Sequence, residues 1–361
     1  MDTLFRTMTD AIATPKLDAA DAAEVETHPE LDPAAKPSDI PGIHSRHPWQ
    51  HPWRAWRSIL KRVYTMDGYH NLALMAAGVA FYAFLSFVPL LGAIVMTYGL
   101  FADPATVTSH MATLFELLPA DAAKLISDQL ISVATTAASK AGLGLGVALV
   151  LSVYGAMRAS SALIQALNVI YEEEESRNIL KTTALSAMLT LGAVFAAIVG
   201  LLSAGALAFL QTAVHVLGQA GVVMIQVLTW VVATVIASSA FAFVYRYGPD
   251  RARARWEWLS VGSVAATLLW LLATLLFGVY AANFANYNAT YGALGAVVVL
   301  LMWLWVSSYA VLIGGEINAE AERQTGVDST TGHERPQGKR GATVADQLPS
   351  KRQHKPRRDK Y

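Results

Sequence analysis

The sequence has 361 residues, of which 54% are hydrophobic and only 15% are charged. A water-soluble domain carries about 25% charged residues, so this composition excludes an ordinary soluble protein and favours a membrane protein. The formal net charge is zero and cysteine is absent, which excludes disulfides, thiolate nucleophiles and cysteine-ligated metal sites.

The N-terminal segment, residues 1–50, is polar and acidic. Residues 1–45 carry nine acidic and three basic side chains without helical or strand periodicity, which predicts a disordered tail and is unlike a cleaved signal peptide. The following stretch, HPWQHPWRAWRSILKR, mixes tryptophan with arginine and lysine. This mixture is typical of a helix in the headgroup region, where we expect its basic side chains to meet anionic lipid.

Long stretches without Asp, Glu, Lys or Arg predict the membrane spans. They cover residues 72–102, 182–245 and 258–315, and the last two are each long enough for two crossings of about 20 residues. A shorter apolar stretch lies at residues 141–157. We therefore predict an all-α fold, a polytopic membrane helix bundle within residues 51–323. Its six transmembrane helices are expected near residues 72–100, 141–166, 182–210, 221–245, 258–281 and 291–317.

The positions of lysine and arginine predict the orientation. Loop 246–257 carries four arginines, whereas loops 211–220 and 282–290 carry no lysine or arginine. Because cytoplasmic loops are enriched in basic residues, we expect both termini in the cytoplasm. Segment 101–140 then lies outside, where apolar residues at helical spacing predict two amphipathic helices on the membrane surface. The tail at residues 324–361 is basic, and we expect it to be disordered and to contact anionic lipid.

A polar face within the predicted bundle carries the main functional expectation. Arg158 is the only base in a predicted span, and a charge at the bilayer centre costs about 2.5–3.5 kcal/mol. Either Arg158 reaches the headgroups and only anchors its helix, or it lines a path or binding site with Glu316 as partner. Pro89 predicts a kink that serves helix packing or acts as a hinge. The face consists of Tyr82, Ser86, Pro89, Tyr154, Arg158, Ser161, Gln165, Asn168 and Glu316.

The outer connection between the last two predicted spans is rich in asparagine and tyrosine. Its side chains form either the outer mouth of a substrate path or an ordered turn at the membrane interface. The residues concerned are Asn283, Asn286, Tyr287, Asn288 and Tyr291.

No sequence pattern indicates catalysis, a cofactor or a bound metal. GLGLG at residues 142–146 lacks the later glycine of a dinucleotide loop and opens a membrane span. His47 and His51 are each followed by a proline and have no third ligand nearby. The predicted spans contain no Asp or His for intramembrane proteolysis. We therefore expect a protein that is not an enzyme.

Several segments resemble one known family: AAGVAFYAFLSFVPLL, SALIQALNVIY, YRYGPDR and the closing stretch that ends in VLIGGEINAE. Over roughly residues 55–323 the chain resembles the YihY/virulence factor BrkB family. This resemblance implies a six-span protein of the bacterial inner (cytoplasmic) membrane with poorly defined biochemistry. Members often carry a ribonuclease label, but the loops here lack the clustered His and carboxylates that RNA cleavage needs, and we expect no specific nucleic-acid partner.

Two functions stay open from the sequence. The first is a transporter or lipid-handling protein that moves or accommodates an amphipathic or anionic substrate along the polar face. The second is a non-catalytic scaffold that assembles envelope machinery through its small-residue helix faces and its tails. A third, ribonuclease activity, is supported by no residue pattern.

Overall fold

Helices make up most of the regular structure. The computed structural model describes residues 40–99, 147, 150–214, 218–283 and 293–349. The labelled helices are η3 (Pro48–Gln50), α2 (Trp53–Tyr69), α3 (Leu72–Gly99), α6 (Ile179–Val214), α7 (Gly218–Tyr247), α8 (Trp256–Asn283), α10 (Ala293–Arg323) and α11 (Thr343–Asp346). A further helix covers residues 150–170. The predicted all-α class is confirmed.

Four of the long helices are apolar enough to cross a membrane. Their apolar windows are Ile179–Ala196 in α6, Gly221–Tyr247 in α7, Trp256–Tyr280 in α8 and Val297–Arg323 in α10. A fifth crossing results if the bent pair of α2 and α3 is one span. The remaining predicted span, 141–166, overlaps the helix at residues 150–170. In the part of the chain that is described, a polytopic helical membrane protein is therefore confirmed, and the predicted number of six spans is approximate.

A sharp bend separates α2 from α3. The two helices differ in direction by 64°. Asn71, the second of the two residues between them, has a φ of 52°. Asparagine enters this left-handed conformation more readily than other residues with a side chain, so it suits the corner. The bend holds His70 at the junction of the two helices.

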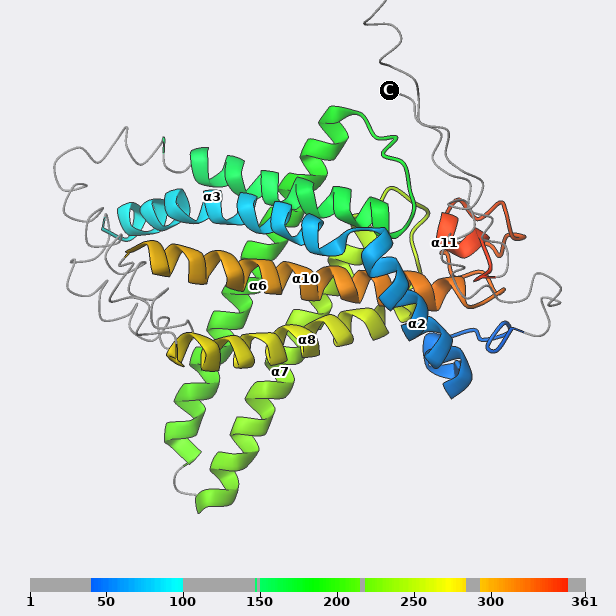
Figure 1. Cartoon of the computed structure of the whole chain (residues 1–361). Coiled ribbons are helices and arrows are strands. Elements are labelled where there is room, and N and C mark those ends of the chain that lie inside the picture. The colour runs from blue at the N-terminus through cyan, green and yellow to red at the C-terminus, as the bar shows by residue number, and fades with distance from the viewer. Residues whose placement is uncertain (1–39, 100–146, 148–149, 215–217, 284–292, 350–361) are drawn as a thin grey trace, which may run out of the picture.

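Helix α10 lies at the centre of the bundle. It packs against α8, α3, α2 and α11, and Figure 1 shows it between α3 and α8. Residues 314–323, its last ten, are all buried. Glycines allow this close packing: a Cβ atom on Gly262 of α8 would overlap the carbonyl oxygen of Gly314 in α10. Small residues at a crossing let two helix backbones approach each other within a membrane.

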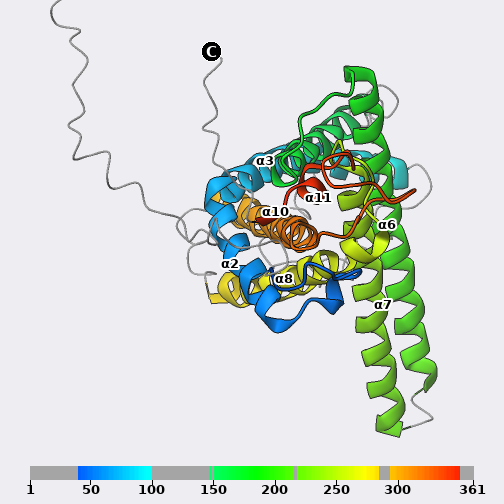
Figure 2. The ribbon, with the colours of Figure 1, turned by 90° about the vertical axis from the view of Figure 1, so that its right-hand side faces the viewer.

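Helices α6 and α7 form a hairpin that projects from the bundle (Figures 1 and 2). Only 11% of the apolar window of α6 and 6% of that of α7 are buried. Large apolar side chains such as Phe195 and Trp230 are exposed on them. Lipid tails are as apolar as leucine, so these exposed faces suit a hydrocarbon environment.

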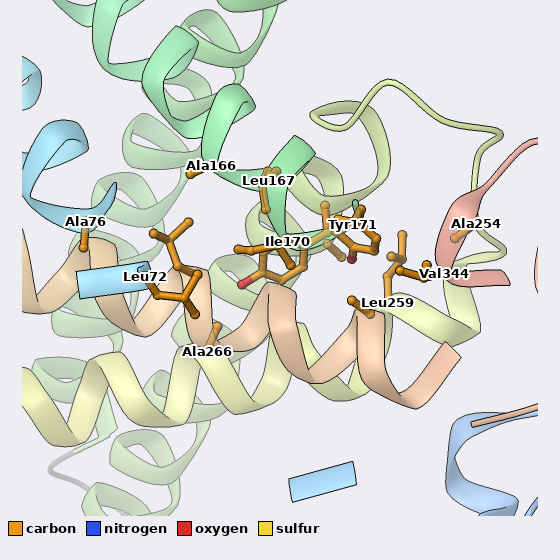
Figure 3. Packing of buried hydrophobic residues seen from close by; sticks show 14 residues of the cluster. Leu72, Ala76, Ala166, Leu167, Ile170, Tyr171, Ala254, Leu259, Ala266 and Val344 are labelled. Carbon is orange, nitrogen blue, oxygen red and sulfur yellow. The ribbon is translucent and has the colours of Figure 1, made fainter. Parts of the chain in front are cut away.

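The main apolar core joins six helices and the loop between α7 and α8 (Figure 3). It contains Leu72 of α3, Leu167 of the helix at residues 150–170, Leu259 of α8, Leu312 of α10 and Val344 of α11, all fully buried. Because Val344 is one of them, the C-terminal segment is part of the folded unit.

The segment at residues 324–349 is folded, so the predicted disordered tail is wrong over this range. Arg340 is buried and donates to the carbonyl oxygens of Gly326 at 2.6 Å and Ala345 at 2.7 Å. The polar composition suggested disorder because the segment lacks apolar periodicity. Its order comes instead from hydrogen bonds that satisfy buried polar groups, which a periodicity analysis does not detect.

Residues 40–50, the end of the predicted N-terminal tail, are also ordered. The amide of Gly326 donates to the carbonyl oxygen of Ile43 at 2.8 Å, which ties the two ends of the described chain together. The predictions for residues 1–39, 101–140 and 350–361 lie outside the described residues.

Candidate functional site

A group of polar side chains lies where the helix at residues 150–170 packs against α3. The backbones approach closely, since a Cβ atom on Gly155 would lie 2.8 Å from Cα of Ser86. Nε of Arg158 donates to the hydroxyl oxygen of Tyr154 at 3.0 Å, and the guanidinium carbon lies 5.2 Å from the centre of the tyrosine ring. Tyr82 of α3 also lies close to Arg158. The structure thus brings together Tyr82, Ser86, Tyr154 and Arg158, which we call the Arg158 face.

Arg158 has neutral partners. Its side chain is exposed, as are those of Tyr154 and Tyr82. Among the residues that the structure describes, no Asp or Glu forms an ion pair with Arg158. Toward the described residues, the guanidinium therefore keeps unused donors on a surface made largely of apolar side chains.

Glu316, the predicted partner of Arg158, pairs with His70 instead. Nδ1 of His70 lies 2.9 Å from Oε2 of Glu316, and the two side chains are 3% and 1% exposed. The predicted pair of Arg158 and Glu316 is therefore wrong. The bend between α2 and α3 carries His70 to the buried end of α10, a placement that no local pattern in the sequence indicates.

Glu316 belongs to a larger group of buried and half-buried charged or ionisable side chains, which we call the inner charge cluster. It consists of Arg62, His70, Glu172, Arg251, Glu316, Glu320, Glu322 and Arg323. Besides the pair of His70 and Glu316, its ion pairs are Arg62–Glu320 at 2.5 Å, Arg251–Glu322 at 2.6 Å, Arg323–Glu172 at 2.8 Å and Arg323–Glu320 at 3.4 Å. Each carboxylate meets at least one basic side chain, which is the condition for keeping such charges buried.

The cluster joins segments that are far apart in the sequence. Arg62 comes from α2, Arg251 from the loop between α7 and α8, and Glu320 from α10. The guanidinium carbon of Arg251 also lies 4.9 Å from the ring centre of Tyr171. Because removing one partner would leave a buried charge unpaired, the cluster holds these segments in one arrangement.

The other residues of the predicted face lie elsewhere. Ser161 is half-buried and Gln165 is exposed. Asn168 is buried at the end of its helix, where it donates to Glu175 at 2.9 Å and accepts from the amide of Asp250 at 2.8 Å. Asn168 therefore connects two loops.

Pro89 lies within α3, and its side chain falls outside the described part of the structure. The same holds for the predicted outer mouth. Asn283 is the last residue of α8 and its side chain is not among those described, and Asn286, Tyr287, Asn288 and Tyr291 lie outside the described residues. The kink and the outer mouth stay predictions.

The histidines near the start of α2 have partners within the protein. His51 is buried, and its Nε2 lies 3.1 Å from the carbonyl oxygen of Ala321. Burial lowers the pKa of His51, which favours its neutral form. His47 contacts the carboxylate of Glu257. Across the described ranges, no three or more His, Asp or Glu side chains are grouped so that they could hold a metal ion.

Most residues of the inner charge cluster were not predicted from the sequence. A signal was present in GGEINAEAER at residues 314–323, where Glu316 and Glu320 share one face of the helix at 100° per residue and Glu322 points to another side. They cannot all face water if that helix packs within a bundle. Their basic partners could not be identified, because Arg62 and Glu320 are 258 positions apart.

Comparisons with known proteins agree on the class of protein. A family model described as virulence factor BrkB matches residues 67–339. YfkH of Bacillus subtilis, whose name describes it as ribonuclease-like, is 27% identical over 270 residues, which cover 73% of this chain and 94% of YfkH. A UPF0761 membrane protein of Idiomarina loihiensis is 29% identical over 216 residues, covering 59% of this chain and 72% of that protein. No solved structure matches the chain.

Proposed function

This chain belongs to the virulence factor BrkB family, and we propose that it is an inner-membrane protein that moves or accommodates an anionic amphipathic molecule, such as a phospholipid, along the Arg158 face. In this proposal both termini lie in the cytoplasm, as the arginines of loop 246–257 favour. The single observation that carries it is an exposed arginine, in a helix that the sequence predicts to span the membrane, that has only neutral partners among the described residues.

The depth of Arg158 supports a functional role. Its helix ends at Ile170, 12 residues further on, which is about 18 Å along the axis. On the neighbouring α3, Ser86 lies 14 residues from Leu72, or about 21 Å. Both helix ends lie beside the inner charge cluster, so in this proposal Arg158 lies deeper in the hydrocarbon layer, about 30 Å thick, than the cluster does. An arginine side chain is shorter than either distance, which argues against simple anchoring in the headgroups.

The charge of Arg158 indicates the class of ligand. Arginine stays protonated in proteins, and its planar group binds phosphate or carboxylate through paired hydrogen bonds. The Tyr154 hydroxyl accepts the hydrogen bond from Nε of Arg158, and the guanidinium lies over the tyrosine ring. These contacts orient the guanidinium without neutralising its charge. An anionic headgroup would supply the missing charge, while the exposed apolar side chains of the same helix, such as Val150 and Val153, suit its acyl chains.

In this proposal the inner charge cluster has a structural role and does not contact the substrate. His70 and Glu316 are too buried to meet an outside substrate. The name of YfkH suggests ribonuclease activity for that protein. Among the described residues no cluster of metal ligands supports it here, and the partly exposed contact of His47 with Glu257 is a single pair.

Transbilayer movement of a labelled lipid tests the proposal. The purified protein is reconstituted into vesicles of phosphatidylethanolamine and phosphatidylglycerol that contain fluorescent phosphatidylglycerol, and dithionite reports the fraction in the outer leaflet. We expect faster exchange than in protein-free vesicles. Arg158→Ala should slow it about tenfold or more, because a hydrogen bond to a charged group contributes about 1.5–3 kcal/mol. Arg158→Lys should retain part of the rate.

Lys181→Ala is the matched control, since Lys181 is exposed at the start of α6 and far along the chain from the Arg158 face. Circular dichroism and gel filtration establish that each variant is folded. A wild-type rate equal to that of empty vesicles, or an unchanged rate in Arg158→Ala, would overturn the proposal and favour the alternative of a non-catalytic envelope scaffold.

A further inference from the structure

Helix α2 has one face packed against the bundle. Ala55, Ile59, Val63 and Met66 are buried at helical spacing, and Ile59 and Val63 pack with Ile317 of α10. Polar contacts lie on this side too, since Asp67 accepts a hydrogen bond from the hydroxyl of Tyr309 at 2.8 Å. The only acid of α2 is therefore directed at the bundle.

The opposite face of α2 is aromatic and basic. It carries six residues at helical spacing, which we call the α2 outer face: Trp53, Arg54, Arg57, Leu60, Lys61 and Tyr64. Trp53 is 75% exposed and Tyr64 is 83% exposed. No acid within the described ranges forms an ion pair with its three bases. The face thus presents three positive charges between apolar anchors.

The direction of α2 suits a position along the membrane surface. It is inclined by 64° to α3, the helix that enters the predicted first span. Figures 1 and 2 both show α2 at the periphery, at the end of α3 where the bundle carries its buried charges. A helix at this angle to a crossing helix runs closer to the membrane plane than to its normal.

We infer that the α2 outer face is a docking surface for the anionic lipid headgroups of the leaflet on its side of the membrane. Tryptophan and tyrosine rings prefer the headgroup level, and lysine and arginine on an interfacial helix bind phosphate-bearing lipids. The three bases and the absence of an acid on this face give the charge complementarity. This surface is distinct from the Arg158 face.

The buried side of α2 gives such binding a structural consequence. Arg62, on that side, pairs with Glu320 of the inner charge cluster, and the helix ends next to His70. Lipid bound on the outer face would therefore hold α2 against α10 from the opposite side.

Native mass spectrometry of the detergent-purified full chain tests the inference, with phosphatidylglycerol or phosphatidylcholine added. The triple variant Arg54→Gln, Arg57→Gln, Lys61→Gln should bind phosphatidylglycerol at least tenfold more weakly, because each basic residue near an anionic surface contributes roughly a fivefold factor. Its binding of phosphatidylcholine should be unchanged. The matched control is the triple variant Lys181→Gln, Arg335→Gln, Lys339→Gln, which removes the same charge from exposed bases elsewhere.

Three results would overturn the inference. In the first, the α2 triple variant binds phosphatidylglycerol as the wild type does. In the second, both triple variants lose equal affinity, which would indicate a general charge effect. In the third, phosphatidylglycerol binds only after the nine acids of residues 1–39 are replaced by amides. That result would indicate that the acidic N-terminal segment, and not lipid, occupies the α2 outer face. The α2 triple variant should lose the same affinity for phosphatidylglycerol whether or not Arg158→Ala is also present. This inference and the proposed function can therefore fail separately.

Discussion

His70 and Glu316 form a buried pair in which Nδ1 lies 2.9 Å from Oε2. The pair connects the corner between α2 and α3 to the end of α10. Removing one member of a buried hydrogen-bonded pair typically costs about 1–3 kcal/mol, because the other member is left without a partner. The pair is therefore a main support of the arrangement in which α10 is surrounded by the other helices.

A double-mutant cycle tests this pair. His70→Ala and Glu316→Ala should each lower the free energy of unfolding by about 1–3 kcal/mol. The double variant should lose less than the sum, with a coupling of about 1–3 kcal/mol, because the second replacement removes a partner that is already unpaired. Denaturant titration in mixed micelles at neutral pH, followed by circular dichroism, measures the three values.

The cycle of Arg158→Ala with Glu316→Ala is the control. Arg158 contacts Tyr154 and Glu316 contacts His70, so these two losses should add within about 0.5 kcal/mol. Additive losses in the His70 cycle, or a coupling in the Arg158 cycle, would contradict the geometry.

The crossing of α8 and α10 makes a prediction about glycine. A Cβ atom on Gly262 would overlap the backbone of Gly314 and the side chain of Asn318, whereas one on Gly278 of the same helix would meet nothing within 4 Å. Gly262→Ala should destabilise the protein by about 1–3 kcal/mol, since two helix backbones must separate. Gly278→Ala should be neutral or stabilise by up to about 1 kcal/mol. Melting temperatures in detergent measure both, and equal temperatures would refute the close crossing.

Arg340 and Lys339 are neighbours with opposite environments. Arg340 is buried among the carbonyl oxygens of Gly326 and Ala345, whereas Lys339 is exposed. Arg340→Ala should reduce the local stability of residues 324–349 by on the order of 3 kcal/mol, because several charge-assisted hydrogen bonds are lost. Limited proteolysis should then cleave this segment much faster. Lys339→Ala should leave the cleavage rate unchanged, and equal rates in the two variants would indicate that Arg340 does not hold the segment.

The stability of the loop before α6 should decrease at acidic pH. Both carboxylate oxygens of Glu175 accept hydrogen bonds from the Arg177 guanidinium at 2.6 Å, and these bonds lower the pKa of Glu175 below its ordinary value. The folded state therefore gains stability from the ionised group that is complete above the ordinary pKa and is lost as the pH falls below about 4.5.

Hydrogen exchange measures this effect at the Arg177 amide, which donates to Glu175. Its protection, corrected for intrinsic exchange, should fall several-fold between pH 7 and pH 3.5. Glu175→Gln should show low protection at both pH values. Peptides from α8 report whether the whole protein unfolds, and a pH-independent protection in the wild type would disprove the role of this pair.

Some features of this protein followed from local patterns. The charge-free runs at residues 182–245 and 258–315 were sufficient for the membrane class, because a hydrocarbon layer excludes unpaired charge whatever the tertiary contacts are. The proximity of Tyr154 and Arg158 also followed, since residues four apart share one face of a helix. Both inferences depend only on the geometry of a helix and on the properties of the surrounding hydrocarbon, and neither requires knowledge of tertiary contacts.

The partners of buried charges were decided by the tertiary structure alone. Glu316 was recognised as unusual, yet its partner His70 is 246 positions away and reaches it through a bend at Asn71. Residues 324–349, which include Arg340, were predicted to be a disordered tail. Their order depends on hydrogen bonds within that segment and to Ile43, which no local pattern shows. A sequence pattern records the environment a residue needs, whereas the identity of a distant partner depends on how the whole chain packs.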